Sequence, residues 1–599
     1  MLIKGKILLG IIVIVALACV AIIIFSDNRN REYEQDFEFA SVIPQNTMAY
    51  ISFRNMAQFV DNAQYLGMVQ LYNDPRMRPL KQLLNSYLSQ VDMALSMMQI
   101  DSDTIKNAFC GEFALAILNM DFNAIGSMMP DIDAALFLNV GEAAPILKEK
   151  LTPLFKMSIE IKNSYCSFYK LVMPTPVPVF IALDNNGLFV TTKKETMEYI
   201  FSNNAKVLSQ SDNFIVAKQT VLPDNVGILA YYNYKNIINK ICNFIPEEYT
   251  ELTKNMLKIL KLDQILSVSV ASTINGDEIL DKVHIQWAID AVPIVPSYDF
   301  LQFIPQDVLL LSHNCIDSNT LYNVIQQIIE ALPEEMRSVA KEQINSFEET
   351  FGFTLKDLLL SLDNEMMLTI SKNSDIEKME IPKTENQQQQ MMIDVMKYIP
   401  DVALQIKCKN VEKMQQILTT LIKLIPNANL VTTEYNDSTI VSLEIPNSPI
   451  IPSFVFIDNR LVITLDSNTI KKVATSQNVS LPQELQHTQN KNTILQRCFV
   501  NLKEIVQLYY PLILPILENQ MEANNMRKSL IPSVKVLQKY ITNVSDCSSY
   551  QDNQLLEEIH SPCGLFSLNA MLRVAMFLKQ TLYDIPMQQQ YNSSMEMDR

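Results

Sequence analysis

The sequence predicts an α+β protein, with an N-terminal transmembrane helix followed by two tandem homologous units, each a mainly antiparallel sheet with long amphipathic helices. Three observations predict this fold. An uncharged apolar run opens the chain, six segments of its first part recur later in the same order, and strand-like runs alternate with a few amphipathic patterns. The predicted boundaries are a cytoplasmic stub and signal-anchor at 1–25, a linker at 26–37, units at 38–292 and 297–576, and a tail at 577–599.

The composition is that of a chain with ordinary globular cores. Of 599 residues, 48% are hydrophobic and 19% are charged, and the length exceeds what one core normally holds. The net charge of -17 argues against DNA or RNA binding, because affinity for nucleic acid comes mainly from clustered Lys and Arg. The low count of 11 glycines argues against Gly-rich phosphate loops.

The apolar run from Ile7 to Phe25 contains no charged residue. As a helix it would span about 28 Å, enough for the hydrocarbon core of a bilayer. Lys4 and Lys6 precede it, whereas acidic residues outnumber basic ones between Asp27 and Glu38. The positive-inside rule therefore predicts a single-pass protein of the inner membrane with a cytoplasmic N-terminus and a periplasmic ectodomain.

An alternative for this segment is a cleaved signal. Ala16 and Ala18 could precede a signal-peptidase site, and Cys19 could mark a lipoprotein box. However, Ala16 stands where that box usually carries Leu, and apolar residues follow Cys19. The retained anchor is the preferred interpretation, and cleavage or lipidation at Cys19 stays open.

Six segments recur in order, at offsets between 253 and 276 residues. The matched pairs begin at or centre on Val42 and Phe303, Glu112 and Glu365, Asp133 and Asp401, Pro178 and Pro452, Lys235 and Lys503, and His284 and His560. The match from Pro178 places Asp184 over Asp458. The spacing from Glu365 to Asp401 in the second unit is longer than the spacing from Glu112 to Asp133 in the first. This difference predicts an inserted polar loop at about 371–397.

Local signals place elements within each unit. Pro44 and Pro305 lead the opening strands, since proline is tolerated at the first residue of a strand. The stripe of apolar residues over 321–332 predicts an amphipathic helix capped by Asp317 or Ser318. The Asp-Asn sequences at 184 and 458 predict tight turns between paired strands.

At these residues the chain resembles a family of bacterial membrane-anchored envelope proteins. Members have a Pro-led strand after the anchor, a Gly-Glu strand and a late aspartate hairpin, here Gly111-Glu112 and 184–190. The resemblance covers most of 38–480, and Asn364 departs from it by replacing the Gly before Glu365. Because the family has no assigned activity, the resemblance implies an exported location and an α+β fold, and no chemistry.

The sequence offers no catalytic, cofactor or metal motif. His284 and His560 correspond in the repeat, but neither has a second ligand at metal spacing, so a packed histidine is the preferred interpretation. Ser338 and Lys341 form an S-x-x-K pattern, but the S-D-N at 211–213 precedes it and a K-T-G is missing, so we reject a penicillin-recognising enzyme.

Glu112 and Glu365 could be a pair of catalytic carboxylates. They lie at matching positions in separate units, however, and glutamate is seldom buried. We therefore expect two solvent-facing residues at strand ends and no catalytic pair.

The cysteines do not match between the units, so most are expected to be buried thiols. Cys547 and Cys563 flank a predicted strand pair in an oxidising compartment, and we expect a disulfide between them.

The preferred function is that of a non-enzymatic, membrane-anchored envelope protein that binds or scaffolds another protein through its ectodomain. Two alternatives remain: a carrier of lipid or another apolar ligand, and an enzyme of unrecognised type. No cofactor and no nucleic-acid partner are expected.

Overall fold

The computed structural model describes much of the chain beyond the predicted anchor. The described residues are 38–78, 82, 111–121, 131–140, 144–172, 178–184, 187–202, 206–287, 298–315, 317–373, 400–425, 429–436, 438–445, 448, 450–475, 481–488, 494–523, 531–551 and 554–564. Within these residues, no helix has the length and apolar character needed to cross a membrane. The predicted anchor at 7–25 and most of the predicted loop at 371–397 lie outside them.

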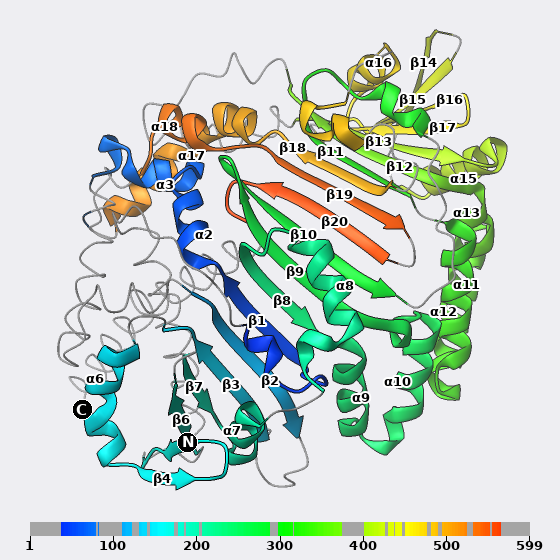
Figure 1. Cartoon of the computed structure of the whole chain (residues 1–599). Helices are drawn as coiled ribbons and strands as arrows, with labels where there is room; N and C mark the ends of the chain where they lie inside the picture. The colour runs from blue at the N-terminus through cyan, green and yellow to red at the C-terminus, as the bar shows by residue number, and fades with distance from the viewer. Residues whose placement is uncertain are drawn as a thin grey trace, which may run out of the picture.

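The fold is mixed α+β with antiparallel strands and many helices, as predicted, but the strands form one large sheet where the sequence predicted a separate sheet in each unit (Figure 1). Ten strands form the first half-sheet: β1 Ala49–Arg54, β2 Phe113–Asp121, β3 Asp131–Leu138, β4 Ile159–Lys162, β5 Ser167–Lys170, β6 Phe180–Leu183, β7 Leu188–Thr191, β8 Gly227–Tyr232, β9 Ile265–Asn275 and β10 Glu278–Trp287. Ten more form the second half-sheet: β11 Val308–Cys315, β12 Leu362–Ser371, β13 Asp401–Cys408, β14 Asn429–Tyr435, β15 Ser438–Glu444, β16 Ser453–Ile457, β17 Arg460–Thr464, β18 Ile494–Val500, β19 Val544–Gln551 and β20 Gln554–Ser561.

The strand pairings run in the same order in both half-sheets. The first reads β4-β5-β6-β7-β3-β2-β1-β8-β9-β10, and the second reads β14-β15-β16-β17-β13-β12-β11-β18-β19-β20. β10 pairs with β20, so the two half-sheets join into one continuous sheet. Figure 1 shows β19 and β20 lying beside β10 in the middle of the molecule. We call this β10–β20 pairing the seam.

Register agrees between corresponding strands. Ala49 of β1 is opposite Ile117 and Tyr232, while Leu310 of β11 is opposite Ile370 and Val500. These registers place Lys235 and Lys503 at corresponding positions, each three residues past Tyr232 or Val500. The sequence match at these two lysines therefore coincides with a match in strand register.

The helices pack on both faces of the sheet. The α-helices are α2 Met56–Ala63, α3 Gly67–Asn73, α6 Ala144–Lys156, α7 Lys194–Phe201, α8 Asp212–Val221, α9 Tyr234–Phe244, α10 Glu247–Ile259, α11 Ser318–Ala331, α12 Glu334–Phe351, α13 Leu355–Ser361, α15 Val411–Lys423, α16 Ser467–Thr475, α17 Leu502–Ala523 and α18 Val534–Tyr540. The 3₁₀ helices are η1 Phe39–Ser41, η2 Pro75–Met77, η4 Leu208–Gln210, η5 Leu262–Gln264, η6 Tyr298–Phe303 and η9 Gln483–Thr488.

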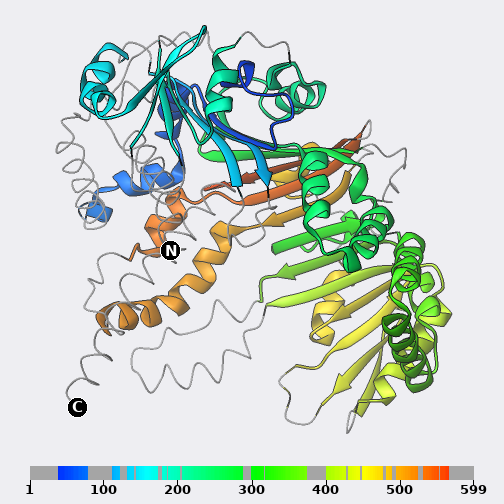
Figure 2. The same ribbon diagram turned by 90° about the horizontal axis from the view of Figure 1, so that it is seen from below.

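Local sequence explains the predicted helix α11. The carboxylate of Asp317 accepts hydrogen bonds from the backbone N–H groups of Asn319 and Thr320, which satisfies donors that a helix start leaves unpaired. This confirms Asp317 as the N-cap. Figure 2 shows α11 and α12, in green, along one side of the second half-sheet.

The largest core lies on one face of the first half-sheet. Helix α8 crosses that face in front of β8, β9 and β10 (Figure 1) and buries Phe214, Ala217 and Val221 against it. η1 packs into the same core, where the ring of Phe39 stacks on that of Phe137 at 5.0 Å between centroids. η1 and α8 therefore cover the same face as parts of one apolar cluster.

Candidate functional site

Glu112, predicted to face solvent, is fully buried. Its carboxylate accepts hydrogen bonds from the hydroxyl of Tyr50 and, at 2.8 Å, from the backbone N–H of Phe39, and the guanidinium of Arg54 lies 3.9 Å away. Burial raises the pKa of Glu112, and the nearby Arg54 charge opposes that rise. Arg54 in turn pairs with Glu38 at 2.8 Å. The prediction failed because these partners compensate burial, and the carboxylate holds η1 against the sheet.

Glu365, also predicted to face solvent, is buried as well. It accepts from the backbone N–H of Phe300 in η6 at 3.4 Å and lies 2.9 Å from Nε2 of His313. Each glutamate therefore binds the main chain of the 3₁₀ helix that precedes its half-sheet. Nine strand-to-strand steps separate β2 from β12, about 43 Å along the sheet at the usual spacing. Paired catalytic carboxylates must lie within about 10 Å, so these two do not form such a pair.

The second half-sheet carries a row of buried polar side chains that the sequence analysis largely missed. The row crosses adjacent strands β18, β11, β12, β13 and β17 and consists of Arg497, His313, Glu365, Gln405 and Arg460. In the first half-sheet, the residues that correspond to Gln405 and Arg497 are Phe137 and Leu229. Of these five residues only Glu365 stood out in the sequence, since a buried arginine in a strand has no local signature.

Arg460 shows how this row is stabilised. Its Nη1 donates to Oε1 of Gln405 at 2.6 Å, and its guanidinium carbon lies 3.4 Å from the ring centroid of Phe303. Burial lowers the pKa of Arg460 to about 10. A cation over an aromatic ring and one amide acceptor thus hold η6 on the sheet. The contacts described for this row are those of a packing network.

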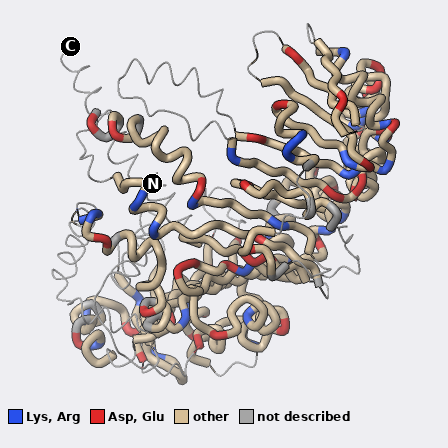
Figure 3. Tube along the Cα trace, turned by 90° about the horizontal axis from the view of Figure 1, so that it is seen from above, with Lys and Arg blue, Asp and Glu red and all other residues tan. Residues whose placement is uncertain are grey.

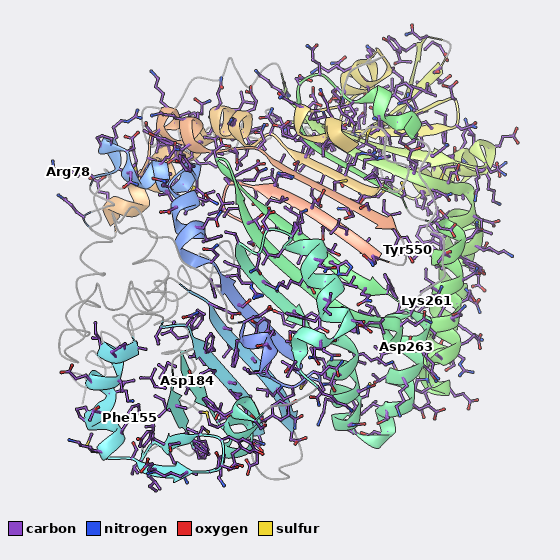
Figure 4. The ribbon with its side chains drawn as sticks, viewed as in Figure 1. Arg78, Phe155, Asp184, Lys261, Asp263 and Tyr550 are labelled. Atoms are coloured by element: carbon purple, nitrogen blue, oxygen red, sulfur yellow. The ribbon has the colours of Figure 1, made fainter. Side chains whose placement is uncertain are left out.

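The predicted turns sit on corresponding hairpins, but the residue match at them is wrong by one position. Phe180 is opposite Thr191 in the first hairpin, and Ser453 is opposite Thr464 in the second. Asp184 therefore corresponds to Ile457 and not to Asp458. Asp184 lies at the end of β6 beside β7 (Figure 4), and its Oδ1 accepts from the N–H of Gly187.

The second hairpin closes in a tight turn. Asp458 begins a two-residue turn with a left-handed φ of 54°, a conformation that Asp tolerates better than most residues. The Asp-Asn sequences on which the match was based therefore lie one register position apart in the two hairpins. Pro44 and Pro305 both lie between a 3₁₀ helix and the first strand of their half-sheet, ahead of the strands they were predicted to begin.

The predicted disulfide between Cys547 and Cys563 is not formed, and the thiol of Cys563 is free. The hairpin register pairs Cys547 with Glu558 and Ser545 with His560. Continued to Cys563, this register reaches a position about five residues, or roughly 17 Å, from Cys547. A disulfide needs Cα atoms about 4.4–6.8 Å apart, so the register separates these cysteines too far.

The histidine pair lies at the seam. Nε2 of His284 is 3.2 Å from Oε1 of Gln554, and Nδ1 of His560 is 2.6 Å from Oε1 of Glu278. These contacts correspond to each other, because Glu278 and Gln554 begin β10 and β20. The sequence match of His284 with His560 thus reflects two equivalent cross-seam contacts. No group of three or more potential metal-binding His, Cys, Asp or Glu side chains occurs in the described parts of the chain.

Helices join the half-sheets on either side of the seam. Helix α10 packs on α11, and α3 packs on α18 through a cluster that includes Leu71, Met77 and Val536. The hydroxyl of Tyr540 also donates to the carboxylate of Asp74 at 2.8 Å. Figure 3 shows acidic and basic residues interspersed along the chain, in keeping with the many single ion pairs.

The strand β14 ends the sheet and is exposed along most of its length. Asn429 to Glu434 are all exposed, and in the described parts of the chain β14 pairs only with β15. The N–H of Leu443 in β15 donates to Pro452, away from β14, so alternation places the groups of Leu430, Thr432 and Glu434 on the outer edge. Their backbone donors and acceptors are available to another strand.

A cavity of about 380 Å³ lies between the segment before β1, strands β2 and β3, and helices α7 and α9. Most of its lining residues are of polar type, among them Asp133, Glu195, Thr196, Tyr199, Asn236 and Lys240, while apolar atoms supply more of its surface than polar atoms do. Thr196 donates to both carboxylate oxygens of Asp133, at 2.7 and 2.8 Å. Sequence matching singled out Asp133 as a repeat landmark and gave no sign of a cavity.

Comparisons with known proteins give little further information. No protein-family model and no curated protein match the sequence. Among solved structures, crystal form III of TP0453 is 11% identical, covers 43% of this chain and 83% of that chain, and has a TM-score of 0.22. Crystal form I of TP0453 is 8% identical, covers 45% and 93%, and has a TM-score of 0.20. Scores of this size carry no argument about fold or function.

Proposed function

We propose that this chain is a non-enzymatic protein of the cell envelope, anchored in the inner membrane by residues 7–25, whose periplasmic part binds another protein. The single observation that carries the proposal is the open edge at β14. An extended segment of a partner adds to that edge as a further antiparallel strand. Strand addition of this kind gains its affinity from main-chain hydrogen bonds.

We also propose that the exported part consists of two tandem copies of one α+β unit, at about 38–292 and 297–576. The common strand order, the matched registers and the equivalent glutamate contacts support this. Duplication leaves two outer edges, β4 and β14, which have diverged.

The contrast between the two edges supports β14 as the binding site. Soluble proteins protect exposed edges with short strands and charged side chains. β4 has four residues, and its Glu160 and Lys162 form an ion pair at 3.3 Å. β14 has seven residues, with Val431, Thr432 and Thr433 favouring extended backbone and Glu434 as its only charge. The longer edge lacks the protection that the shorter edge has.

Hydrogen exchange tests the proposal. In purified protein, the outward N–H groups of Leu430, Thr432 and Glu434 should exchange fast, because water is their partner. In native envelope membranes, the peptide covering β14 should exchange at least about tenfold more slowly, as it would if the partner strand covered these groups. Equal exchange in both preparations would refute strand addition.

A matched pair of variants sharpens this test. Thr432→Pro removes an outward N–H at an edge position that tolerates proline, so it should abolish the slowing in membranes. Thr432→Val keeps the N–H and the branched side chain and should behave as wild type. If both variants lose the slower exchange in membranes to the same extent, side-chain contacts and not strand pairing cause that slower exchange.

The anchor has its own test. Protease added to intact spheroplasts should degrade the bulk of the chain, because the ectodomain is exported. A fully protected chain would contradict the orientation, and a mature N-terminus at Cys19 would replace the anchor with a lipoprotein.

A further inference from the structure

The cavity beside Asp133 has no part in strand addition at β14. The second half-sheet has an aspartate at the corresponding position, Asp401. Asp133 and Asp401 hold corresponding positions in β3 and β13, since Ala135 is opposite Thr191 and Ala403 is opposite Thr464. The two aspartates therefore give a direct comparison of one site with two different surroundings.

In the second half-sheet, a lysine side chain of the protein itself is bonded to the aspartate. The ammonium of Lys472 in α16 donates a short hydrogen bond to Oδ2 of Asp401. Lys472 lies eight residues after Thr464, and the residue eight after Thr191 in the first half-sheet is Tyr199. Tyr199 carries no charge, and its hydroxyl donates to the carbonyl of Lys206 at 2.7 Å.

In the first half-sheet, no ammonium of the described residues is bonded to the carboxylate of Asp133, and Lys193, whose charge also acts on Asp133, pairs with Asp131 at 2.7 Å. Thr196 is its bonded partner, and among the described residues no Lys or Arg forms an ion pair with it. Burial raises the pKa of Asp133 although Thr196 and the charge of Lys193 lower it. Burial likewise raises the pKa of Asp401 beside Lys472, so the two sites differ in the bonded cation and not in the direction of the pKa shift. Lys240, the cation in the cavity lining, pairs with Asp121 at 3.3 Å.

We propose that this cavity binds a small organic amine, with its ammonium on Asp133 in the position that the Lys472 ammonium takes on Asp401. Glu195 adds a second carboxylate to the lining, which favours a cation and suits a diamine. Leu118 and Pro44 supply apolar surface for a short alkyl chain. The volume of about 380 Å³ lies in the range of small-molecule pockets.

The test uses full-length protein in detergent and two probes of the same length, the diamine cadaverine and the neutral 1,5-pentanediol. Isothermal titration should show saturable one-to-one binding of cadaverine and none of pentanediol. Asp133→Asn should weaken cadaverine binding at least about tenfold, because a charge-assisted hydrogen bond is lost. Asp401→Asn is the matched control and should leave binding unchanged.

A second variant tests the site without removing its carboxylate. Tyr199→Lys recreates the arrangement around Asp401, so its own ammonium should occupy Asp133 and abolish cadaverine binding. Tyr65→Lys, at an exposed tyrosine outside the cavity lining, is the matched control and should bind as wild type. The proposal is overturned if wild type prefers neither probe, or if Tyr199→Lys binds cadaverine as tightly as wild type. If Asp133→Asn fails to fold, Tyr199→Lys and its control decide.

Discussion

Lys282 and Glu558 face each other across the seam, with Nζ of the lysine 3.2 Å from Oε1 of the glutamate. They hold corresponding positions in β10 and β20, each two residues before the matched histidines His284 and His560. The pair therefore lies on the approximate twofold axis that relates the half-sheets. On a true twofold axis each residue would face its own copy, whereas here a lysine faces a glutamate.

Charge reversal at the seam should reveal this pairing. Lys282→Glu or Glu558→Lys alone should lower the free energy of unfolding by about 1 kcal/mol, because like charges then meet in a half-buried pair. The double variant should recover most of that loss. Urea denaturation of all four proteins gives the coupling energy, and a coupling near zero would mean that the pair contributes nothing to the seam.

Gly67 should be essential to the contact between α3 and α18. A Cβ atom at this position would lie 1.8 Å from the carbonyl oxygen of Tyr540, which is backbone and cannot turn aside. Gly67→Ala should therefore lower the free energy of unfolding by about 2 kcal/mol or more. Gln70→Ala, on the exposed side of α3, is the control and should change it by less than about 0.5 kcal/mol. Equal effects in a thermal melt would argue against this close approach.

Stability should depend on pH through His560. Its hydrogen bond to Glu278 raises the pKa of His560 above the value of about 6.5 in an unfolded chain. The resulting stabilisation is fully present below about pH 6.5 and is lost as the pH rises through the folded pKa. His560→Gln should thus cost about 1 kcal/mol at pH 5.5 and much less at pH 8.5.

His284 provides the opposite control. Burial lowers its pKa, so wild type loses stability as the pH falls below about 6.5. The free energy of unfolding of His284→Gln, relative to that of wild type, should therefore be higher at pH 5.5 than at pH 8.5. If both variants showed the same pH trend, the two contacts would not differ as the structure indicates.

Sequence pattern predicted the sheet class and helix α11 because those depend on local signals. Asp317 caps α11 through donors two and three residues away. The burial of Glu112 could not be predicted in this way, since its bond to Phe39 spans 73 residues of sequence.

The remaining errors have equally specific causes. The match of Asp184 to Asp458 followed the identical Asp-Asn letters, while strand pairing follows backbone register and differs by one residue. Cys547 and Cys563 are near in sequence, but the hairpin register moves them apart along the strands. The cavity at Asp133 depends on segments between Pro44 and Lys240, and no local motif joins them.

β10 and β20 join the two half-sheets in one register, with Lys282 opposite Glu558. Glu278 and Asn275 close a two-residue turn, so alternation makes Lys282 and Glu558 a non-hydrogen-bonded pair across the seam, with Cα atoms about 4.5 Å apart. Cysteines at such positions are close enough for a disulfide. Cys547 also lies opposite Glu558, so the test needs a Cys547→Ser background.

Oxidative crosslinking of Lys282→Cys/Glu558→Cys in that background is the most direct measurement. We expect a disulfide between positions 282 and 558 in peptide maps of native protein, and little crosslinking in the shifted pair Lys282→Cys/Leu556→Cys. Crosslinking of the shifted pair in preference to the predicted pair, or of neither pair, would rule out this register of β10 on β20.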